Sequence, residues 1–436
     1  MKKVLIISYY WPPAGGPGSQ RAVKFAKYLP EFGWEPVILT VRKGEFAYID
    51  LTLFKDVPSN LKIYRTNSIE PFTLFKTFTG RNKGDLIPIG ILTSKKGRIR
   101  DTVAYWIRSN LFVPDARIGW IPYAYKLGLD IIRKERIDII FTTSPPHSLQ
   151  LSGYLLKKRT GLPWVTDLRD PWVDIRYYEH LDRFFMAEKL DTCFENKVLS
   201  STDYLISINS RIVDHYLNKR NLKDYKAIPN GFDQIYFDKF AYKRDNFFKI
   251  LHVGNWGTDQ NSPELFAALK RIGILKTHFL NHVKVTNYGK VSAEVMRSVR
   301  LNNLEKNFFS KQYIPYENMV REIVNSDLLL IIIARAEKNE MFISAKIFDY
   351  LGARRPIFAL APLNGELAKL MKDHQVGFVV DYNDEKLIES KIKKIYEYWL
   401  DNKDLNLKYV GIEKYERKNL AKQLSSILET TWRRNV

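Results

Sequence analysis

The sequence predicts an α/β protein with two Rossmann-like domains of parallel strands that face each other across a cleft. Short apolar runs alternate with amphipathic stretches along the chain, which is the pattern of βαβ units. A chain of 436 residues is too long for one ordinary core and suits two domains. The strand–helix series also begins twice, at residue 3 and at residue 249, with a polar and aromatic stretch before the second start.

The composition is that of a well-filled globular protein, with 45% hydrophobic and 14% aromatic residues. The single cysteine, Cys193, cannot form an internal disulfide and favours a reducing cytoplasm. Pro12 and Pro13 stop the first apolar run too early for a secretory signal. The longest apolar run, residues 328–334, is far shorter than the roughly 20 residues that span a bilayer. We therefore expect a soluble, cytoplasmic protein.

The net charge of +21 calls for an anionic partner. Nucleic acid, anionic lipid headgroups and diphosphate substrates are all candidates. The segment from Phe72 to Arg100 concentrates this charge, because its basic residues are interleaved with Phe and Ile and its one acid is Asp85. That mixture is typical of a patch that binds an anionic membrane surface, and also of a long loop whose lysines are only solvated.

The first domain, residues 1–235, opens with a strand at residues 3–8 and the glycine-rich turn YYWPPAGGPG. An amphipathic helix at residues 19–32 and a strand at residues 36–41 complete a βαβ unit. The turn is not G-x-G-x-x-G, and the second strand ends without the acid that holds an NAD ribose, so the pattern argues against a dehydrogenase. Gly15 and Gly16 would let the backbone approach a sugar or phosphate, or they only form a tight turn.

Two further strands of this domain end in polar motifs. The strands at residues 137–142 and 164–166 lead into TSPPHS and DLRDPW. Open α/β sheets bind ligands at the carboxyl ends of their strands, so Arg169 and Asp170 are candidate site residues. His147 is a candidate for contact with an acceptor, although helix capping or packing is the commoner role of such a histidine. Strands at residues 204–208 and 227–228 follow.

The second domain, residues 236–410, begins with the strand KILHVG, after which Gly254 and Asn255 open a loop. Its later strands are expected at residues 283–288, 308–309, 328–333, 356–361 and 377–380, with helices between them. The segment 411–436 has apolar residues at helical spacing in Leu420, Leu424 and Leu428, and we expect a terminal helix there.

One helix of the second domain looks suited to hold a nucleotide diphosphate. In FISAKIFDYLGARRPIFALAP, Ser344 is a plausible N-cap and Gly352 can end the helix. Lys346 and Asp349 stand three apart and project from one face. A helix N-terminus strengthened by Lys346 attracts a diphosphate, and a carboxylate one turn on suits the ribose hydroxyls. A solvated surface pair would explain this stretch about as well.

The motifs together resemble the family-4 retaining glycosyltransferases, which have the two-domain GT-B fold. The resemblance is carried, in order, by YYWPPAGGPG, TSPPHS, DLRDPW, IPNGFD, KILHVGN and AKIFDYLGARRPIF. It implies transfer of a sugar from a nucleotide-diphosphate donor to a hydroxyl of a glycan or lipid-linked acceptor, with retained configuration. The resemblance also implies that the terminal helix crosses back to the first domain. No metal and no other cofactor is expected, and the sequence has no D-x-D pair.

The resemblance also implies roles for single residues. Asp349 takes the place of the family's ribose-binding glutamate, with Glu340 one residue out of register from the family's other glutamate. Arg169 and Asp170 stand where many members have a histidine, and they would orient the acceptor or stabilise oxocarbenium-like charge. The Arg and Lys that many members have after the strand HVG are absent, which leaves Lys346 as the best remaining cation for the diphosphate and Arg21 as a weaker one. On the donor side we place Lys346, Asp349, Glu340, Ser344, Gly254 and Asn255, and on the acceptor side Gly15, Gly16, Arg21 and His147.

This reading predicts a bacterial-type enzyme of surface-polysaccharide synthesis, in the cytoplasm or peripherally on the inner face of the cell membrane. A sugar-nucleotide epimerase or hydrolase of the same fold is the alternative within enzymes. A basic nucleic-acid-binding protein is the alternative from another class, but no recognition motif supports it, and we expect no nucleic-acid partner.

Overall fold

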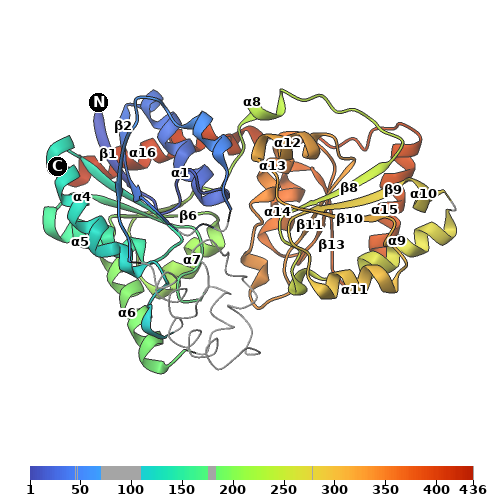
Figure 1. Ribbon diagram of the computed structural model, residues 1–436, viewed down its shortest axis with the longest axis horizontal. Coiled ribbons are helices and arrows are strands. Elements are labelled where there is room, and N and C mark those ends of the chain that lie inside the picture. The colour runs from blue at the N-terminus through green and yellow to red at the C-terminus, as the bar shows by residue number, and fades with distance from the viewer. Residues whose placement is uncertain (45, 47, 70–109, 175–182, 277, 436) are drawn as a thin grey trace. The chain divides into compact units, whose positions relative to one another are not determined.

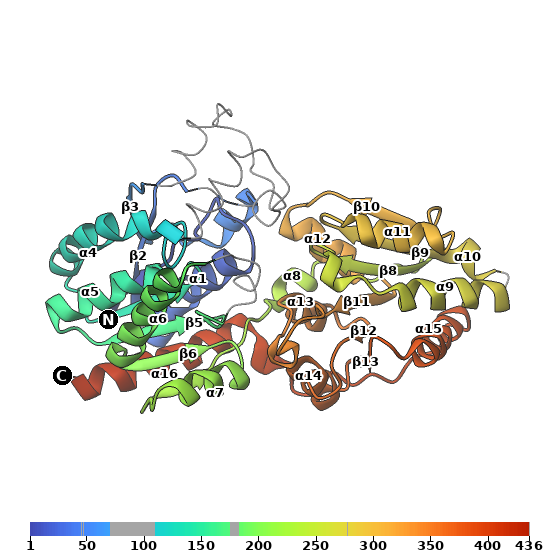
Figure 2. The ribbon, with the colours of Figure 1, turned by 90° about the horizontal axis from the view of Figure 1, so that it is seen from below.

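The computed structural model describes residues 1–44, 46, 48–69, 110–174, 183–276 and 278–435. Contacts within the chain divide it into two units, shown in Figures 1 and 2. Unit 1 comprises Met1–Pro229 and Arg417–Val436, and unit 2 comprises Asn230–Glu416. The basic segment from Phe72 to Arg100 lies outside the described residues.

Unit 1 contains a parallel sheet of seven strands in the order β3-β2-β1-β4-β5-β6-β7. Each neighbouring pair is parallel; β1 pairs with β4 through Val4 and Ile139, for example. The strands are β1 Lys2–Ile7, β2 Trp34–Val41, β3 Lys62–Thr66, β4 Ile139–Ser144, β5 Trp164–Leu168, β6 Tyr204–Ser207 and β7 Tyr225–Ala227. The central strand β4 is buried along its whole length, its polar residues Thr142, Thr143 and Ser144 included, as expected for a parallel strand with both faces covered.

Helices cover both faces of this sheet. The helices are α1 Pro17–Tyr28, α4 Ile121–Glu135, α5 Leu149–Thr160, α6 Phe185–Ser201, α7 Ser210–Lys219 and α16 Arg417–Asn435. One core lies between the sheet and α1 and α16, which run side by side, and the other lies under α4, α5, α6 and α7 (Figure 1). The last helix of the chain therefore belongs to the first sheet, and the predicted return of the terminal helix is confirmed.

Unit 2 contains a second parallel sheet, of six strands in the order β10-β9-β8-β11-β12-β13. The strands are β8 Phe248–Val253, β9 Val283–Tyr288, β10 Phe308–Lys311, β11 Leu328–Ile332, β12 Ile357–Leu360 and β13 Gly377–Val380. The helices are α8 Gln234–Phe237, α9 Pro263–Leu275, α10 Phe279–His282, α11 Ala293–Leu301, α12 Tyr316–Val324, α13 Lys346–Ala353, α14 Glu366–His374 and α15 Glu385–Leu400. One continuous core joins the sheet to helices on both faces.

Both sheets follow the Rossmann order, in which the first three strands run outward one way and the later strands the other way. The order reverses between β1 and β4 in unit 1, and between β8 and β11 in unit 2. Ligands of open α/β sheets bind beyond the carboxyl ends of the strands at this switch point. The predicted fold of two Rossmann-like parallel sheets is confirmed, and the switch points locate the candidate sites.

Several local predictions differ from the structure. The edge strand β3 was not predicted, because KIYRT mixes charged and apolar residues and is only partly buried. The first helix ends at Tyr28 and continues as a 3₁₀ turn, since Pro30 has no N–H for the α-helical ladder. The polar and aromatic stretch before the second strand–helix series has the composition of a linker, but it buries Phe232 and Phe237 in the core of unit 2.

Short 3₁₀ helices complete the two units. They are η1 Leu29–Phe32, η2 Leu51–Asp56, η4 Ile118–Trp120, η6 Thr258–Gln260, η7 Asn339–Met341 and η8 Ile412–Tyr415. None of the described helices combines the length and the apolar composition that crossing a membrane requires.

Candidate functional site

The candidate nucleotide helix, α13, begins directly at Lys346, beyond the carboxyl end of β11. Its N-cap residue is Ala345, which makes no side-chain cap, so the predicted capping by Ser344 is wrong. Ser344 instead accepts the N–H of Ile347 through its backbone carbonyl, at 3.1 Å. The first N–H groups of α13 therefore have no side-chain cap, which leaves the N-terminus attractive to an anion.

The C-terminal end of α13 also differs from the prediction. Arg354, with a φ of 51°, takes the left-handed position at which we expected Gly352. Gly352 lies inside the helix, and a Cβ there would be 2.6 Å from Cε2 of Phe237. The glycine is needed because α8 packs closely on this turn, rather than because the helix ends there.

Lys346 forms a hydrogen bond that the sequence did not predict. Its Nζ lies 2.8 Å from Nε2 of His252, the fifth residue of β8, whose Nδ1 lies 2.7 Å from Oδ1 of Asn287. The amide of Asn287 is oriented by its Nδ2, which donates to the carbonyl of Gly289 at 2.9 Å. Since Oδ1 of Asn287 can only accept, His252 carries its proton on Nδ1, and Nε2 accepts from Lys346. The imidazole is thus neutral.

The electrostatics of this pair favour an anionic ligand. Burial lowers the pKa of His252 well below its usual value, and the charge of Lys346 lowers it further. Burial also lowers the pKa of Lys346 to about 7. In the described part of the chain, no carboxylate forms an ion pair with Lys346. A ligand phosphate could therefore supply the counter-charge that the protein does not provide.

The loop after β8 brings backbone close to Lys346. Gly254 has a φ of 99°, and a Cβ at this position would lie 3.8 Å from Nζ of Lys346. A Cβ on Gly289 would lie 2.5 Å from the carbonyl oxygen of Gly254, so Gly289 allows the two loops to touch, whereas Gly254 is required by its positive φ. Asn255 is exposed, and its Oδ1 accepts the N–H of Lys290 at 3.1 Å. The predicted residues Gly254, Asn255 and Lys346 thus belong to one group at the switch point.

Asp349 lies one turn further along α13 and is held by an aromatic hydroxyl. Oη of Tyr316, the first residue of α12, donates to Oδ1 of Asp349 at 2.7 Å. The ring of Tyr316 packs edge-on against Tyr236, with centroids 5.6 Å apart. Lys346 is bonded to His252 instead, so the two charged residues of α13 do not simply neutralise each other.

Glu340 lies in η7, in the loop between β11 and α13. It is half-buried, whereas Met341, which stands at the family's register position, is buried. The backbone of Glu340 lies close to Gly365, the N-cap residue of α14, because a Cβ added to Gly365 would lie 3.3 Å from the Cα of Glu340. Of Glu340 and Met341, Glu340 is therefore the residue whose side chain can reach a ligand.

In unit 1, the glycine-rich turn forms an uncapped start of α1. Gly16 is the N-cap residue, with a φ of 95° and no side-chain cap. The N–H of Gly15 donates to the backbone carbonyl of Tyr48 at 2.9 Å. The guanidinium of Arg169 lies against the first turn, because a Cβ on Gly18 would be 3.0 Å from its Nη2. Nε of Arg169 donates to the carbonyl of Ser144 at 2.6 Å. Together, the helix N-terminus and the guanidinium form an electropositive position.

Asp170 and His147 lie at the same edge of the first sheet. Burial raises the pKa of Asp170, and the charge of Arg169 opposes that rise. No hydrogen bond to the carboxylate of Asp170 comes from any residue that the structure describes. His147 stacks on Trp172, with centroids 5.3 Å apart, and burial followed by the charge of Arg169 lowers its pKa to about 3. His147 is therefore neutral at physiological pH.

Arg21, expected on the acceptor side, is fully buried and bonded to protein. Its Nε and Nη2 donate to the two carboxylate oxygens of Asp167, at 2.8 and 3.0 Å. Its Nη1 and Nη2 also donate to the carbonyls of Pro229 and Ile228, at 2.8 and 2.9 Å. Thr143 donates a further bond of 2.7 Å to Asp167. These contacts join α1, β4 and β5 to the segment at Ile228 and Pro229. The role of Arg21 is therefore structural.

The sequence-predicted residues thus fall into two groups, one in each unit, beyond the carboxyl ends of the strands. The sequence reasoning missed His252, Asn287, Tyr316 and Gly18. Of these, His252 and Gly18 stood in quoted motifs, KILHVGN and YYWPPAGGPG, and a histidine in an otherwise apolar strand could have been noticed. Among the described residues, no group of three or more His, Cys, Asp and Glu side chains could hold a metal ion. The expected metal independence remains a prediction.

Comparisons with known proteins were made for the sequence and for the structure. No protein-family model and no curated protein sequence matches the chain. The structure is similar to sucrose-phosphate synthase from Thermosynechococcus elongatus, with a TM-score of 0.67, 14% identity and coverage of 100% of both chains.

Two further solved structures are similar over nearly their whole length. Trehalose-6-phosphate synthase OtsA has a TM-score of 0.61 and 12% identity, with 99% of both chains covered. A variant of TarM from S. aureus, in complex with Fondaparinux, alpha-GlcNAc-glycerol and UDP, has a TM-score of 0.56 and 13% identity, with 100% of this chain and 99% of that chain covered. With its two parallel sheets and its returning terminal helix, the chain has the α/β GT-B fold of these glycosyltransferases.

Proposed function

We propose that the protein is a retaining glycosyltransferase that moves a sugar from a nucleotide-diphosphate donor to a hydroxyl of a glycan or lipid-linked acceptor. The observation that carries the proposal is the ammonium of Lys346 at the start of α13, whose hydrogen-bonding partner among the residues that the structure describes is the neutral His252. This position lies at the switch point of a Rossmann-order sheet. TarM, which has a similar fold, was crystallised with UDP.

The donor side of the reaction would use the charge of Lys346. As the bond between sugar and diphosphate breaks, negative charge grows on the departing phosphate. The N-terminus of α13 and the ammonium of Lys346 stabilise that charge more strongly in the transition state than in the bound substrate. His252 positions the ammonium by accepting its hydrogen bond, and Asn287 fixes the ring. Asp349, with Tyr316 on one oxygen, would accept hydrogen bonds from the ribose hydroxyls.

The acceptor side would use Arg169 and Asp170. The half-buried carboxylate of Asp170 can accept a hydrogen bond from the attacking hydroxyl or face the positive charge that develops on the sugar. The guanidinium of Arg169 and the uncapped start of α1 can hold an anionic group of the donor or acceptor. We place the reaction in surface-polysaccharide synthesis, at the inner face of the cell membrane.

The reaction can be tested with a panel of nucleotide sugars and with acceptors that carry free hydroxyls. Transfer should require both substrates, should retain the anomeric configuration by NMR, and should persist in EDTA, since Lys346 and α13 supply the positive charge. Donor cleavage at the same rate without acceptor would indicate a hydrolase instead. Release of an epimerised nucleotide sugar would equally contradict the proposal.

Donor affinity should fall as the pH rises above about 7. The unliganded protein has a Lys346 pKa of about 7, so above that pH an intact nucleotide sugar binds together with a proton. The dissociation constant should then rise about tenfold for each pH unit, up to the higher pKa that Lys346 acquires beside the diphosphate. Calorimetry in buffers of different ionisation enthalpy measures this proton uptake. The Lys346→Ala variant should show no such dependence between about pH 7 and 8.5, and uptake that persists in it would refute the assignment.

Asp349→Asn should weaken nucleotide binding about tenfold or more, because a hydrogen bond to a charged group is worth roughly 1.5–3 kcal/mol. Tyr316→Phe is the matched comparison, since it removes the hydroxyl that donates the 2.7 Å bond to the carboxylate and leaves the charge of Asp349 in place. Its effect should be smaller, about two- to fivefold. Titration with a nucleoside diphosphate compares both with the wild type. Equal affinity of Asp349→Asn and the wild type would remove Asp349 from the ribose site.

A further inference from the structure

Helix α6 of unit 1 exposes apolar side chains that the core does not use. Phe184, Phe185 and Met186 are consecutive and are 57%, 73% and 80% exposed. Leu190, one turn later, is 45% exposed. We define the α6 face as Phe184 together with the exposed residues at helical spacing, Phe185, Met186, Lys189, Leu190 and Lys197. Large apolar side chains gathered at one place on a surface usually mark an interaction site.

The opposite face of α6 is fixed, so these side chains cannot turn inward. Asp191 is buried and accepts hydrogen bonds from Nε1 of Trp172, at 2.6 Å, and from Arg183. Glu195 is also buried and accepts from Nζ of Lys219 at 2.9 Å. Rotating the helix would expose the packed Val198 side of the helix and would leave buried carboxylates without partners, at a high cost. The α6 face therefore stays outward, available to an external partner.

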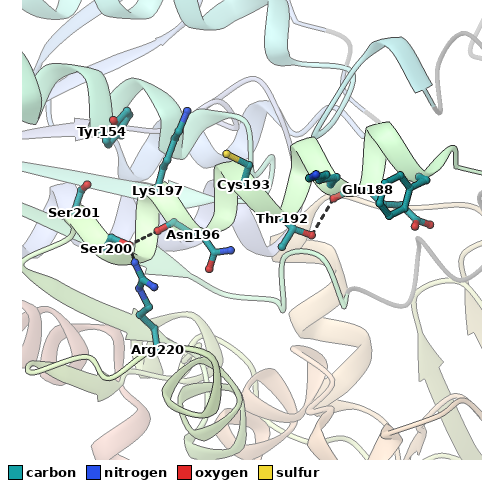
Figure 3. Close-up of a pocket in the computed structure, with 11 residues that line it drawn as sticks. Tyr154, Glu188, Thr192, Cys193, Asn196, Lys197, Ser200, Ser201 and Arg220 are labelled. Carbon is teal, nitrogen blue, oxygen red and sulfur yellow. Dashed lines mark hydrogen bonds between the residues drawn. The ribbon is translucent and has the colours of Figure 1, made fainter.

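The charge of the α6 face indicates what that partner is. Lys189 and Lys197 are exposed beside the apolar residues, and Nζ of Lys189 lies 5.9 Å from the centroid of the Phe185 ring. A surface hollow of about 780 Å³ runs along the same helix, and Figure 3 shows Arg220 reaching Ser200 at one end of it. Among the side chains lining the hollow, Glu188 is the one acid beside Lys189, Lys197 and Arg220. The surface is thus apolar and basic at once.

We propose that the α6 face docks on a bilayer of anionic lipids. Phe184, Phe185 and Met186 protrude at the start of the helix and would enter the boundary between headgroups and acyl chains. Lys189 and Lys197 would meet the lipid phosphates, and the chain's net charge of +21 adds long-range attraction. This surface goes beyond the proposed reaction, and because vesicle binding requires no sugar donor, the two proposals can fail separately.

Co-sedimentation of the full chain with vesicles tests the proposal. The wild type should bind phosphatidylcholine vesicles that contain phosphatidylglycerol, more weakly as salt rises, and should bind pure phosphatidylcholine poorly. Lys189→Gln with Lys197→Gln should weaken binding about 30-fold, which corresponds to about 1 kcal/mol for each lost charge near the surface. Changing Phe184, Phe185 and Met186 together to serine should weaken it at least about tenfold.

Matched controls separate this face from general charge and apolarity. Lys386→Gln with Lys394→Gln removes two exposed lysines at the same spacing from α15, and Ile274→Ser with Leu275→Ser removes two exposed apolar residues of unit 2. Both should bind like the wild type. Wild-type binding by the α6 variants, or equal binding to neutral vesicles, would overturn the proposal. So would a wild-type dimer in solution that the serine variant dissociates, because a second copy would then be the partner.

Discussion

Replacing Lys346 with alanine should slow sugar transfer at saturating donor by about 10²–10³-fold, the usual cost of losing one donor to a developing anion. The ammonium is bonded to a neutral His252, and in the described residues no carboxylate competes for its charge. Its interaction with the diphosphate should strengthen as the leaving group departs, so kcat should fall in addition to the rise in KM that follows from the part of this charge in donor binding. Steady-state kinetics with the nucleotide sugar measures both constants.

Two variants make this result specific to Lys346. Lys369→Ala removes an exposed lysine from α14 of the same unit and should leave the rate within about twofold of the wild type, as expected for a surface substitution. His252→Asn should lower kcat by a smaller factor, because it removes the acceptor that positions the ammonium but keeps the charge. If Lys346→Ala changed only KM, Lys346 would contribute ground-state binding alone.

Arg21→Met should destabilise unit 1 by about 3–5 kcal/mol, the cost of leaving one partner of a buried ion pair alone. The guanidinium and Asp167 are both fully buried, and four hydrogen bonds of Arg21 to protein would be lost. Thr143 would remain as a partner of the carboxylate, but it carries no charge. Urea denaturation followed by tryptophan fluorescence reports mainly on unit 1, which holds most of the tryptophans.

A double variant and a surface control complete this experiment. Arg21→Met with Asp167→Leu should cost less than the sum of the two single changes, because no buried charge is then left alone. Lys418→Met, at an exposed ion pair of 2.6 Å with Glu31, should change the stability by less than about 1 kcal/mol. Wild-type stability of Arg21→Met, together with a raised KM, would show that Arg21 binds a ligand after all.

Much of the fold could be predicted because the strands are apolar runs between turn residues. The strands at Val283–Tyr288 and Gly377–Val380 match the predicted bounds. The edge strand β3 could not be recognised, because its half-exposed residues carry no clear period. The order of the strands in each sheet depends on contacts between distant parts of the chain. The local sequence pattern constrains this order only through the rule that parallel strands are linked by crossover connections.

The site was predictable only where its signal was local. A helix start with Lys346 and Asp349 on one face can be read from a short stretch, whereas the bond to His252 joins residues 94 positions apart. The roles of Arg21 and Arg169 depended on one strand boundary. We expected β5 to stop at Thr166, but it continues to Leu168, so Asp167 shares the face of Val165, where α1 packs. Asp167 therefore binds Arg21, and Arg169 remains at the edge of the sheet.

Ligand-dependent thermal unfolding tests the central claim, that unit 2 holds a nucleotide diphosphate at Lys346 and Asp349, most directly. At a concentration of about one hundred times its dissociation constant, a ligand adds about 2.7 kcal/mol of stability. We predict that at least one nucleoside diphosphate and its sugar raise the unfolding temperature of the wild type, and that the double variant Lys346→Ala with Asp349→Asn loses this shift. The same shift in the double variant, or none with any nucleoside diphosphate or nucleotide sugar in the wild type, would contradict the account.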